Sequence, residues 1–170
     1  MKKLSIIILF VLLSLPILAQ TDSINIVNEG DKMPSFVLSS IANGNINSKD
    51  LNGKVVMITI FATWCGPCQL ELKEINNELW PKYKDNSNFK LLVVGREHTA
   101  EELAKYKETK SFAFPIYPDP VREFTSKFAK QTIPRVYLVD KSGTIVYTSV
   151  GYNKPAFDKM MEKIDILLGE

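Results

Sequence analysis

Residues 54–61 read KVVMITIF, an almost uninterrupted run of apolar and mostly β-branched residues. A run of this kind is typical of a strand buried on both faces, because a half-exposed strand alternates apolar with polar residues. A second run, FKLLVVG, covers residues 89–95. Two such strands indicate a central sheet that is covered by helices.

The segments around these strands predict the other elements. Apolar residues three and four positions apart predict a helix over residues 68–83 that ends near Pro81, and a capping box at residues 99–102 opens a helix to about Lys110. We also expect a hairpin at 35–48, an extended piece at 114–117, a short helix at 121–128, strands at 135–140 and 145–151, and a helix from Pro155. This order predicts an α/β fold: a mixed central sheet with helices on both faces, plus an added N-terminal β-hairpin.

The first nineteen residues have the pattern of a signal peptide. Lys2 and Lys3 precede an apolar stretch, and Ala19 is the expected last residue removed. An uncleaved membrane anchor is the alternative, although a spanning helix needs about 20 apolar residues and Pro16 interrupts this stretch early. We therefore expect a signal peptide at 1–19, a flexible lead-in at 20–33 and one folded domain at 34–170.

The charge of the chain excludes two classes of partner. The 170 residues include 21 Lys and Arg and 19 Asp and Glu, which gives a formal net charge of +2. Loss of Lys2 and Lys3 with the leader would leave a neutral chain, and no block of five or more like charges occurs. Nucleic acids and anionic membranes are therefore not expected partners.

The motif Trp64-Cys65-Gly66-Pro67-Cys68 lies where the first buried strand passes into the following helix. The first N–H groups of a helix have no partners within it, and the dipole is positive there, so a thiolate is stabilised at this place. We expect the pKa of Cys65 to fall below its ordinary value and Cys68, one turn inside, to be shielded. These features predict that Cys65 attacks a partner disulfide and that Cys68 then releases the partner.

A Cys-x-x-Cys pair has three other uses in proteins: a zinc site, an inert bridge and haem attachment. Zinc needs four ligands, whereas the chain offers two cysteines and a single histidine, His98. An inert bridge between Cys65 and Cys68 would close a very small loop and would restrain the unfolded chain little. Attachment of haem needs His directly after the second Cys, and Gln69 stands there.

Together with Thr132-Ile133-Pro134, just before the strand predicted at 135–140, this motif resembles the thioredoxin fold. The resemblance implies that Pro134 is cis and faces the cysteines, and that the backbone of Ile133 pairs with an extended peptide of the partner. An ordinary trans proline that opens a strand is the alternative. The residues expected to contact the partner are Trp64, Gly66, Pro67, Thr132, Ile133 and Pro134.

More narrowly, the chain resembles the exported TlpA/ResA-like branch of the thioredoxin superfamily, which is related to the redoxin and AhpC/TSA proteins. The leader, the stretch GDKMPSFVL at residues 30–38 with its hairpin, and the long segment between residues 95 and 118 carry this resemblance. The match covers about residues 30–168.

One acidic residue follows from the resemblance to this branch. Thioredoxins have a buried Asp six residues before the first Cys, and Thr59 stands there in this chain. The TlpA/ResA-like branch often has Glu six residues after that Cys, and Glu71 matches this position. A buried Glu71 would have a raised pKa and would accept the proton of Cys68. A solvated Glu71 beside Lys73 is the alternative.

Other polar and aromatic residues were given lesser roles. His98, at the start of the helix expected over 99–110, is not expected to act in catalysis. Arg135 directly follows Pro134 and is only a secondary candidate for the border of the partner groove. Tyr117, Phe124 and Phe128 are expected in the core.

The resemblance predicts an exported, periplasmic thiol–disulfide oxidoreductase that is monomeric and needs no cofactor or metal. The residues leave the direction of electron flow open. The resemblance favours a reductant of protein disulfides that takes electrons from a membrane thiol carrier, with cytochrome c maturation as one process it could serve. A peroxidase of the peroxiredoxin type is an alternative, although Thr63 and Cys65 are too close for its motif and no Pro occurs between residues 35 and 66. A secreted binding module without catalysis, in which Cys65 has an ordinary pKa, is the other alternative.

Overall fold

A computed structural model describes residues 24–40 and 44–169 of the chain. Its centre is a five-stranded sheet in the order β5-β4-β3-β6-β7. The parallel strands are β3 (Val55–Phe61), β4 (Phe89–Arg96) and β5 (Ile116–Asp119), and the antiparallel pairs join β3 to β6 (Arg135–Val139) and β6 to β7 (Ile145–Val150). All 7 residues of β3 are buried, so the apolar run at 54–61 is confirmed as a strand buried on both faces.

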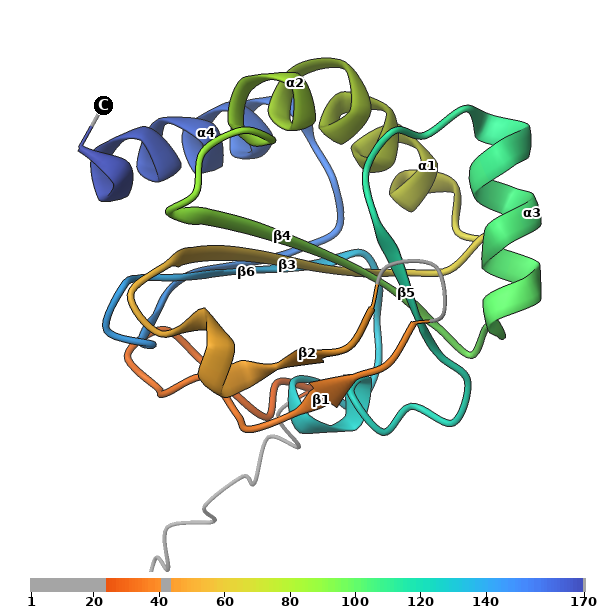
Figure 1. The fold of residues 1–170 in the computed structure, drawn as a ribbon, viewed down its shortest axis with the longest axis horizontal. Helices are drawn as coiled ribbons and strands as arrows, with labels where there is room; N and C mark the ends of the chain where they lie inside the picture. Colours follow the sequence, from red (N-terminus) through yellow and green to blue (C-terminus); the bar gives the residue numbers. More distant parts are fainter. Residues whose placement is uncertain (1–23, 41–43, 170) are drawn as a thin grey trace, which may run out of the picture.

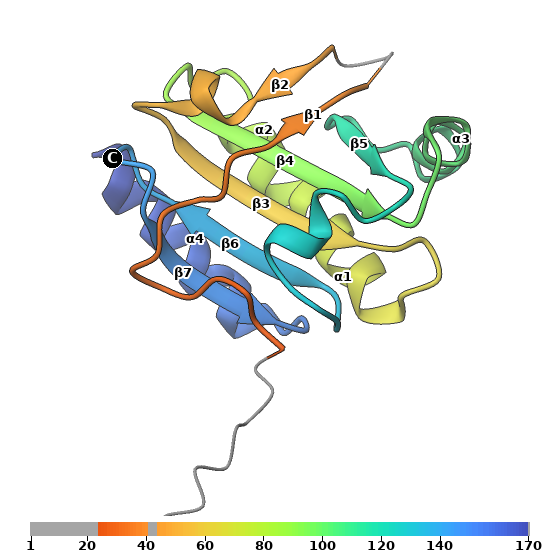
Figure 2. The same cartoon turned by 90° about the horizontal axis from the view of Figure 1, so that it is seen from below.

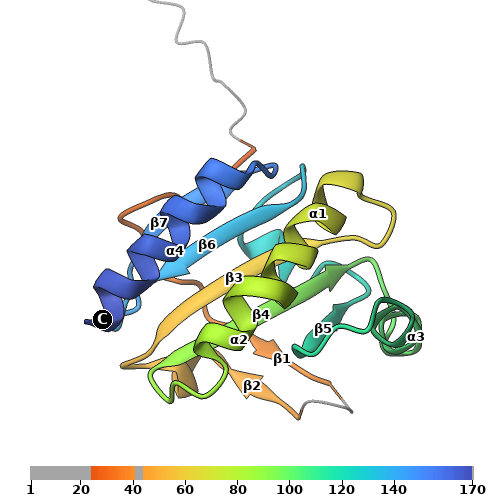
Figure 3. The ribbon, with the colours of Figure 1, turned by 90° about the horizontal axis from the view of Figure 1, so that it is seen from above.

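The longer helices cover one face of this sheet. Figures 1 and 3 show α1 (Gly66–Glu74), α2 (Trp80–Tyr83) and α4 (Lys154–Leu168) on that face, with α3 (Ala100–Lys110) beside β5. One continuous core joins these helices to the sheet and includes both cysteines, Leu72 and Leu103. Helix α1, which carries Cys68, therefore begins shortly after the central strand β3 and packs on the sheet through this core.

The opposite face carries no long helix within the described residues. It is covered by β1 (Val37–Leu38) and β2 (Ile46–Asn47), by the short 3₁₀ helices η1 (Ser48–Leu51) and η3 (Thr125–Lys127), and by the N-terminal segment (Figure 2). A second core, which includes Phe36, Phe124 and Phe128, fills the space beneath them. β1 and β2 pair antiparallel, which confirms the predicted hairpin; the turn predicted at 43–45 lies partly outside the described residues.

The helix predicted to end near Pro81 continues through it. Between α1 and α2 the chain forms one π-helical stretch, η2 (Ile75–Leu79), in which the Trp80 N–H bonds to the carbonyl of Ile75. Proline has no N–H to donate and crowds the preceding turn, so a wider turn just before it lets the chain stay helical. The helix regains its usual pattern when Lys84 N–H bonds to Trp80.

The helix predicted at 121–128 is reduced to the single turn η3. Arg122 has φ 61°, in the left-handed region, which interrupts a right-handed helix at its start. The buried carboxylate of Asp119 accepts bonds from Phe124 N–H at 3.0 Å and from Thr125 N–H and Oγ1 at 2.8 and 2.6 Å. These bonds replace the helical ones and fix a tight turn. Tyr117, Phe124 and Phe128 are buried, as expected.

Residues 24–33 differ from the expected flexible lead-in. Asn25 pairs with Ala129 and Lys32 with Thr144 as isolated antiparallel bridges, and Ile26 N–H bonds to the carbonyl of Phe128. Val27 is buried in the second core. This segment lacks apolar periodicity but gains backbone bonds from the body of the protein, so it belongs to the folded domain.

The predicted signal peptide and its cleavage site lie outside the described residues. In the described ranges 24–40 and 44–169, no helix combines the length and the apolar character needed to cross a bilayer.

Candidate active site

The two cysteines lie at the junction of β3 and α1. Cys65 is the N-cap of α1, and its Sγ accepts a bond of 3.3 Å from the N–H of Cys68. The two sulfur atoms form a disulfide. Cys65 is 5% exposed and Cys68 is fully buried. Only Cys65 is therefore open to an incoming sulfur, which suits the role predicted for it at a helix N-terminus.

The loop before β6 faces this disulfide. The Ile133–Pro134 peptide bond is cis, as predicted. The carbonyl oxygen of Ile133 lies 3.8 Å from Cys65 Sγ, so the two segments meet although 68 positions separate them. A peptide that pairs with the backbone of Ile133 would bring its own sulfur next to Cys65.

The rim of the site is formed by the residues predicted to bind the partner. Trp64 is 66% exposed, an unusual state for so large an apolar side chain, and the Arg96 guanidinium lies 5.9 Å from its ring centre. Gly66, Pro67 and Thr132 are also exposed. Their role in partner binding stays a prediction.

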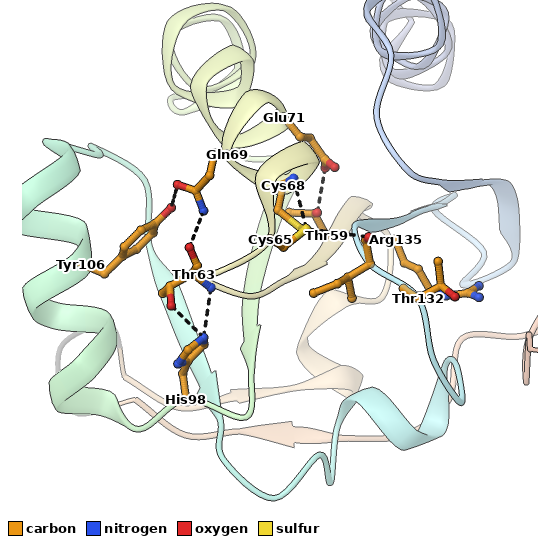
Figure 4. Close-up of a disulfide and its surroundings, with 11 residues drawn as sticks. Thr59, Thr63, Cys65, Cys68, Gln69, Glu71, His98, Tyr106, Thr132 and Arg135 are labelled. Atoms are coloured by element: carbon orange, nitrogen blue, oxygen red, sulfur yellow. Dashed lines mark hydrogen bonds between the residues drawn. A yellow bond between two sulfur atoms is a disulfide. The ribbon is translucent and has the colours of Figure 1, made fainter.

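Glu71 is buried beneath the site, 2% exposed. Its Oε1 accepts a bond of 2.7 Å from the hydroxyl of Thr59, while its Oε2 has no hydrogen-bond partner among the described residues. Burial raises the pKa of Glu71 to about 7, against a smaller lowering by the Thr59 bond. Figure 4 shows Glu71 and Thr59 next to Cys68, the place where a proton acceptor is needed.

Arg135 does not border the groove. Its side chain is 2% exposed and points into the protein, where Nε donates to the carbonyls of Gln131 and Thr132 at 2.9 and 3.0 Å. A second nitrogen donates to Asn25 Oδ1, on the N-terminal segment. Arg135 therefore holds the loop that ends in Pro134 from behind.

Three side chains that sequence reasoning left out of the site hold the peptide of Thr63, just before Trp64. His98 Nε2 accepts from the Thr63 N–H at 3.0 Å, and Gln69 Nε2 donates to the Thr63 carbonyl at 3.0 Å. The hydroxyl of Tyr106 in turn donates to Gln69 Oε1 (Figure 4). The capping box at 99–102 is confirmed at the start of α3. It was the one sequence signal that fixed the position of His98, directly before that helix.

Within the part of the chain that the structure describes, no three His, Cys, Asp or Glu side chains gather where they could hold a metal ion.

The chain matches the Redoxin family model over residues 28–164. Thiol-disulfide oxidoreductase ResA from Bacillus anthracis is 28% identical over 136 residues, which cover 79% of this chain and 78% of that protein. Thioredoxin-like protein YneN from Bacillus subtilis (strain 168) is 29% identical over 146 residues, 82% of this chain and 81% of that protein.

Solved structures agree with this match. The solution structure of a candidate protein disulfide isomerase from Bacteroides thetaiotaomicron is 30% identical, with a TM-score of 0.82 over 86% of this chain and 93% of that one. A thioredoxin family thiol:disulfide interchange protein from Chlorobium tepidum TLS, 22% identical, has a TM-score of 0.66 over 84% and 99% and supports the fold alone. The predicted thioredoxin-like fold is thereby confirmed.

Proposed function

Because the chain belongs to the redoxin family and is a thiol–disulfide oxidoreductase of the thioredoxin superfamily, we propose that it reduces disulfides of other proteins outside the cytoplasm. The observation that carries this proposal is the place of Cys65. Its sulfur caps α1, accepts the Cys68 N–H and is the more exposed of the two. A thiolate at this place is stabilised and accessible, as an attacking sulfur must be.

The proposed reaction has two steps. The Cys65 thiolate attacks one sulfur of the partner disulfide, so that a mixed disulfide forms and the partner's other sulfur leaves as a thiolate, which takes up a proton. Cys68 then gives its proton to Glu71 and attacks the Cys65 sulfur, which breaks the mixed disulfide and releases the partner's second thiolate, and this thiolate also takes up a proton. The partner gains two thiols, and the protein ends with the Cys65–Cys68 disulfide.

Glu71 suits the second step because its pKa of about 7 lets it accept a proton near neutral pH. Cys68 is fully buried, so its proton needs an acceptor inside the protein. Glu71 follows Cys68 by one turn of α1 and lies on the same buried side of that helix.

Trapping of the mixed disulfide tests this assignment. Cys68→Ala should accumulate a covalent adduct with a peptide that carries an internal disulfide, whereas Cys65→Ala should form none. Mass spectrometry identifies the joined cysteine. If neither variant forms the adduct, the proposed exchange reaction is wrong.

The direction of electron flow is also part of the proposal. The resemblance to the TlpA/ResA-like branch supports a reductant, which takes its electrons from a membrane thiol carrier and serves cytochrome c maturation. Equilibration of the Cys65–Cys68 pair with glutathione measures the potential, for which reducing thioredoxins give about −270 mV and strong oxidants about −120 mV. A value above about −150 mV would overturn the reductant assignment.

The proposed location rests on the leader pattern at residues 1–19. Expression in a bacterial host, followed by fractionation and mass spectrometry of the N-terminus, tests it. A chain in the periplasmic fraction that begins at Gln20 supports export and cleavage. Retention of Met1 in the membrane fraction supports the anchored form. We further propose that the protein acts as a monomer on protein thiols and disulfides, which gel filtration of the reduced protein tests.

A further inference from the structure

The peptide of Thr63 is bonded on both sides by side chains from other parts of the chain. His98 accepts its N–H at 3.0 Å, and Gln69, itself held by Tyr106, donates to its carbonyl at 3.0 Å. Thr63 comes two residues before Cys65, on the only link between β3 and α1. The position of this peptide therefore fixes where the chain enters the N-terminus of α1.

His98 is held in a buried position next to the Thr63 peptide. It is the single histidine of the chain and is 7% exposed. It lies between β4 and α3, next to Thr99, which caps α3. The two-step exchange described above makes no use of it.

The bond to Thr63 determines which nitrogen of His98 carries the proton. A backbone N–H only donates, so Nε2 must offer a lone pair, and the proton of the neutral ring is then on Nδ1. Nδ1 lies 3.5 Å from Glu102 Oε2. A protonated ring has two N–H groups and no acceptor, so it cannot keep the bond from the Thr63 N–H.

Protonation offers the ring another partner. Thr63 Oγ1 lies 3.2 Å from Nε2 and can accept from a protonated ring. The Thr63 N–H would then be left without its acceptor, and the loop would have to shift or keep an unsatisfied buried donor. The contact therefore has two states that differ by one proton.

We propose that neutral His98 is a positioning residue for Cys65: it holds the peptide of Thr63, and its protonation loosens the loop that places the Cys65 sulfur at the N-terminus of α1. A loosened loop weakens the bond from Cys68 N–H to Cys65 Sγ, so the thiolate loses part of its stabilisation. With a protonated ring, exchange is then slower than loss of thiolate alone would make it. This inference rests on the proposed role of Cys65 as attacking sulfur.

The groups around His98 define its electrostatic setting. Glu102, Lys105, Tyr106 and Thr63 line one open hollow with it. Glu102 is the charged group for which a contact is found: its Oε2 lies 3.5 Å from His98 Nδ1. On the strand side, Arg96 and Glu97 pair with each other at 3.0 Å. Burial raises the pKa of Tyr106, so its hydroxyl stays protonated as the donor to Gln69.

Nuclear magnetic resonance of the full reduced chain, labelled with ¹⁵N-histidine, tests the bond directly. Above the pH of imidazole titration, the expected ring has its proton on Nδ1, and the Thr63 amide proton resonance follows the same titration as the ring. A proton on Nε2, or a Thr63 amide that does not respond, overturns the proposal.

Alkylation of Cys65 by iodoacetamide across pH 5 to 9 measures the consequence. His98→Leu removes the acceptor and should slow alkylation at pH 7 by about three- to tenfold. His98→Gln places an amide oxygen near the position of Nε2, so it should restore the rate to within about twofold while removing the inflection that imidazole titration adds to the profile. Thr109→Val, in the same hollow, should behave as wild type.

Each outcome decides one assignment. If His98→Leu is alkylated at the wild-type rate, His98 does not position Cys65; if His98→Gln and wild type give the same pH profile, protonation of His98 does not loosen the loop. If His98→Leu fails to fold, the resonance experiment and His98→Gln still decide. A normal inflection together with failure of Cys68→Ala to form an adduct refutes the proposed function and leaves the positioning role intact.

Discussion

The hydroxyl of Thr59 donates a hydrogen bond of 2.7 Å to Glu71 Oε1, and both residues are buried. The bond joins the central strand β3 to α1, the helix that carries Cys68. Two effects act on the carboxyl: burial raises its pKa, and the Thr59 bond lowers it by a smaller amount, so that the pKa is about 7. Glu71 is thus close to half-protonated at neutral pH, which suits a group that both accepts and returns a proton.

Thr59→Val should raise the pKa of Glu71 further. Valine has nearly the same shape but no hydroxyl, so the charged form loses the one bond found for it while its burial is unchanged. We expect an increase of about one unit. The ¹³C chemical shift of the Glu71 carboxyl, followed against pH in the reduced protein, measures it. Thr59→Ser keeps the donor and is the matched control; an unchanged pKa in Thr59→Val would show that the bond does not act on the charged form.

Glu71→Gln should change how stability depends on pH. The pKa of Glu71 is about 7 in the folded chain and near 4.5 when unfolded, so between these values the folded state holds a proton that the unfolded state has lost. Stability therefore falls as pH rises from about 4.5 to about 7, by about 3 kcal/mol in total, and changes no further above. Glutamine does not ionise, so Glu71→Gln does not lose this stability. The unfolding free energy of Glu71→Gln, relative to that of wild type, should therefore rise by about 3 kcal/mol between pH 4.5 and pH 7.

Urea unfolding at several pH values between 4 and 8 measures this difference. Glu162→Gln, on the exposed side of α4, is the control and should show the pH dependence of wild type. Parallel curves for wild type and Glu71→Gln would mean that Glu71 has an ordinary pKa in the folded protein, and its proposed role as proton acceptor would lose its basis.

Local patterns predicted the centre of the site well. The buried run at 54–61 and the motif at 64–68 specify a strand, a turn and a helix N-terminus within a few residues, and short-range geometry alone places Cys65 at the cap. Pro134 was predictable from the resemblance because that motif is also local. The loop that ends in Pro134 approaches Cys65 because β6 pairs beside β3, and the carbonyl oxygen of Ile133 then lies 3.8 Å from Cys65 Sγ.

The supports of the site were not predictable in this way. His98 is 35 positions from Thr63, and Asn25 is 110 positions from Arg135, so these bonds exist only after the sheet has formed. No local residue pattern predicts these bonds, because a histidine at a helix start or an arginine after a proline also occurs in many proteins without such a contact. The same reason explains η3, where the carboxylate of Asp119 replaces helical bonds that the residues of 121–128 would otherwise form.

Arg135→Met should destabilise the protein and weaken its binding of a partner. The carbonyls of Gln131 and Thr132 would lose their donor, and the loop before Pro134 would lose its tie to the N-terminal segment. We expect a loss of about 2–4 kcal/mol in urea unfolding and a raised KM for a disulfide peptide. Lys141→Met, on an exposed turn, is the control. A loss below about 0.5 kcal/mol, the usual effect of a surface change, would rule out this support.

Gly95→Ala should displace α3 through a single side chain. A Cβ on Gly95 would lie 2.7 and 2.8 Å from the two terminal carbons of Leu103, which is 3% exposed and packs α3 against the end of β4. Overpacking of this kind costs about 1–3 kcal/mol. Leu103→Ala leaves a cavity and costs about 2–5 kcal/mol.

The double variant separates this contact from a general loss of stability. Truncation of Leu103 makes room for the methyl group added at Gly95, so Gly95→Ala/Leu103→Ala should lose at least about 1 kcal/mol less than the sum of the single losses in urea unfolding. Strict additivity would mean that Leu103 moves aside without cost. Since α3 also carries Tyr106, which holds Gln69 and through it the Thr63 carbonyl, Gly95→Ala should slow alkylation of Cys65 at pH 7 as well. In the double variant the overlap with Leu103 is removed, so the alkylation rate should partly recover. The reason is that the hydrogen bonds from Tyr106 to Gln69 and from Gln69 to Thr63 link the position of α3 to that of Cys65.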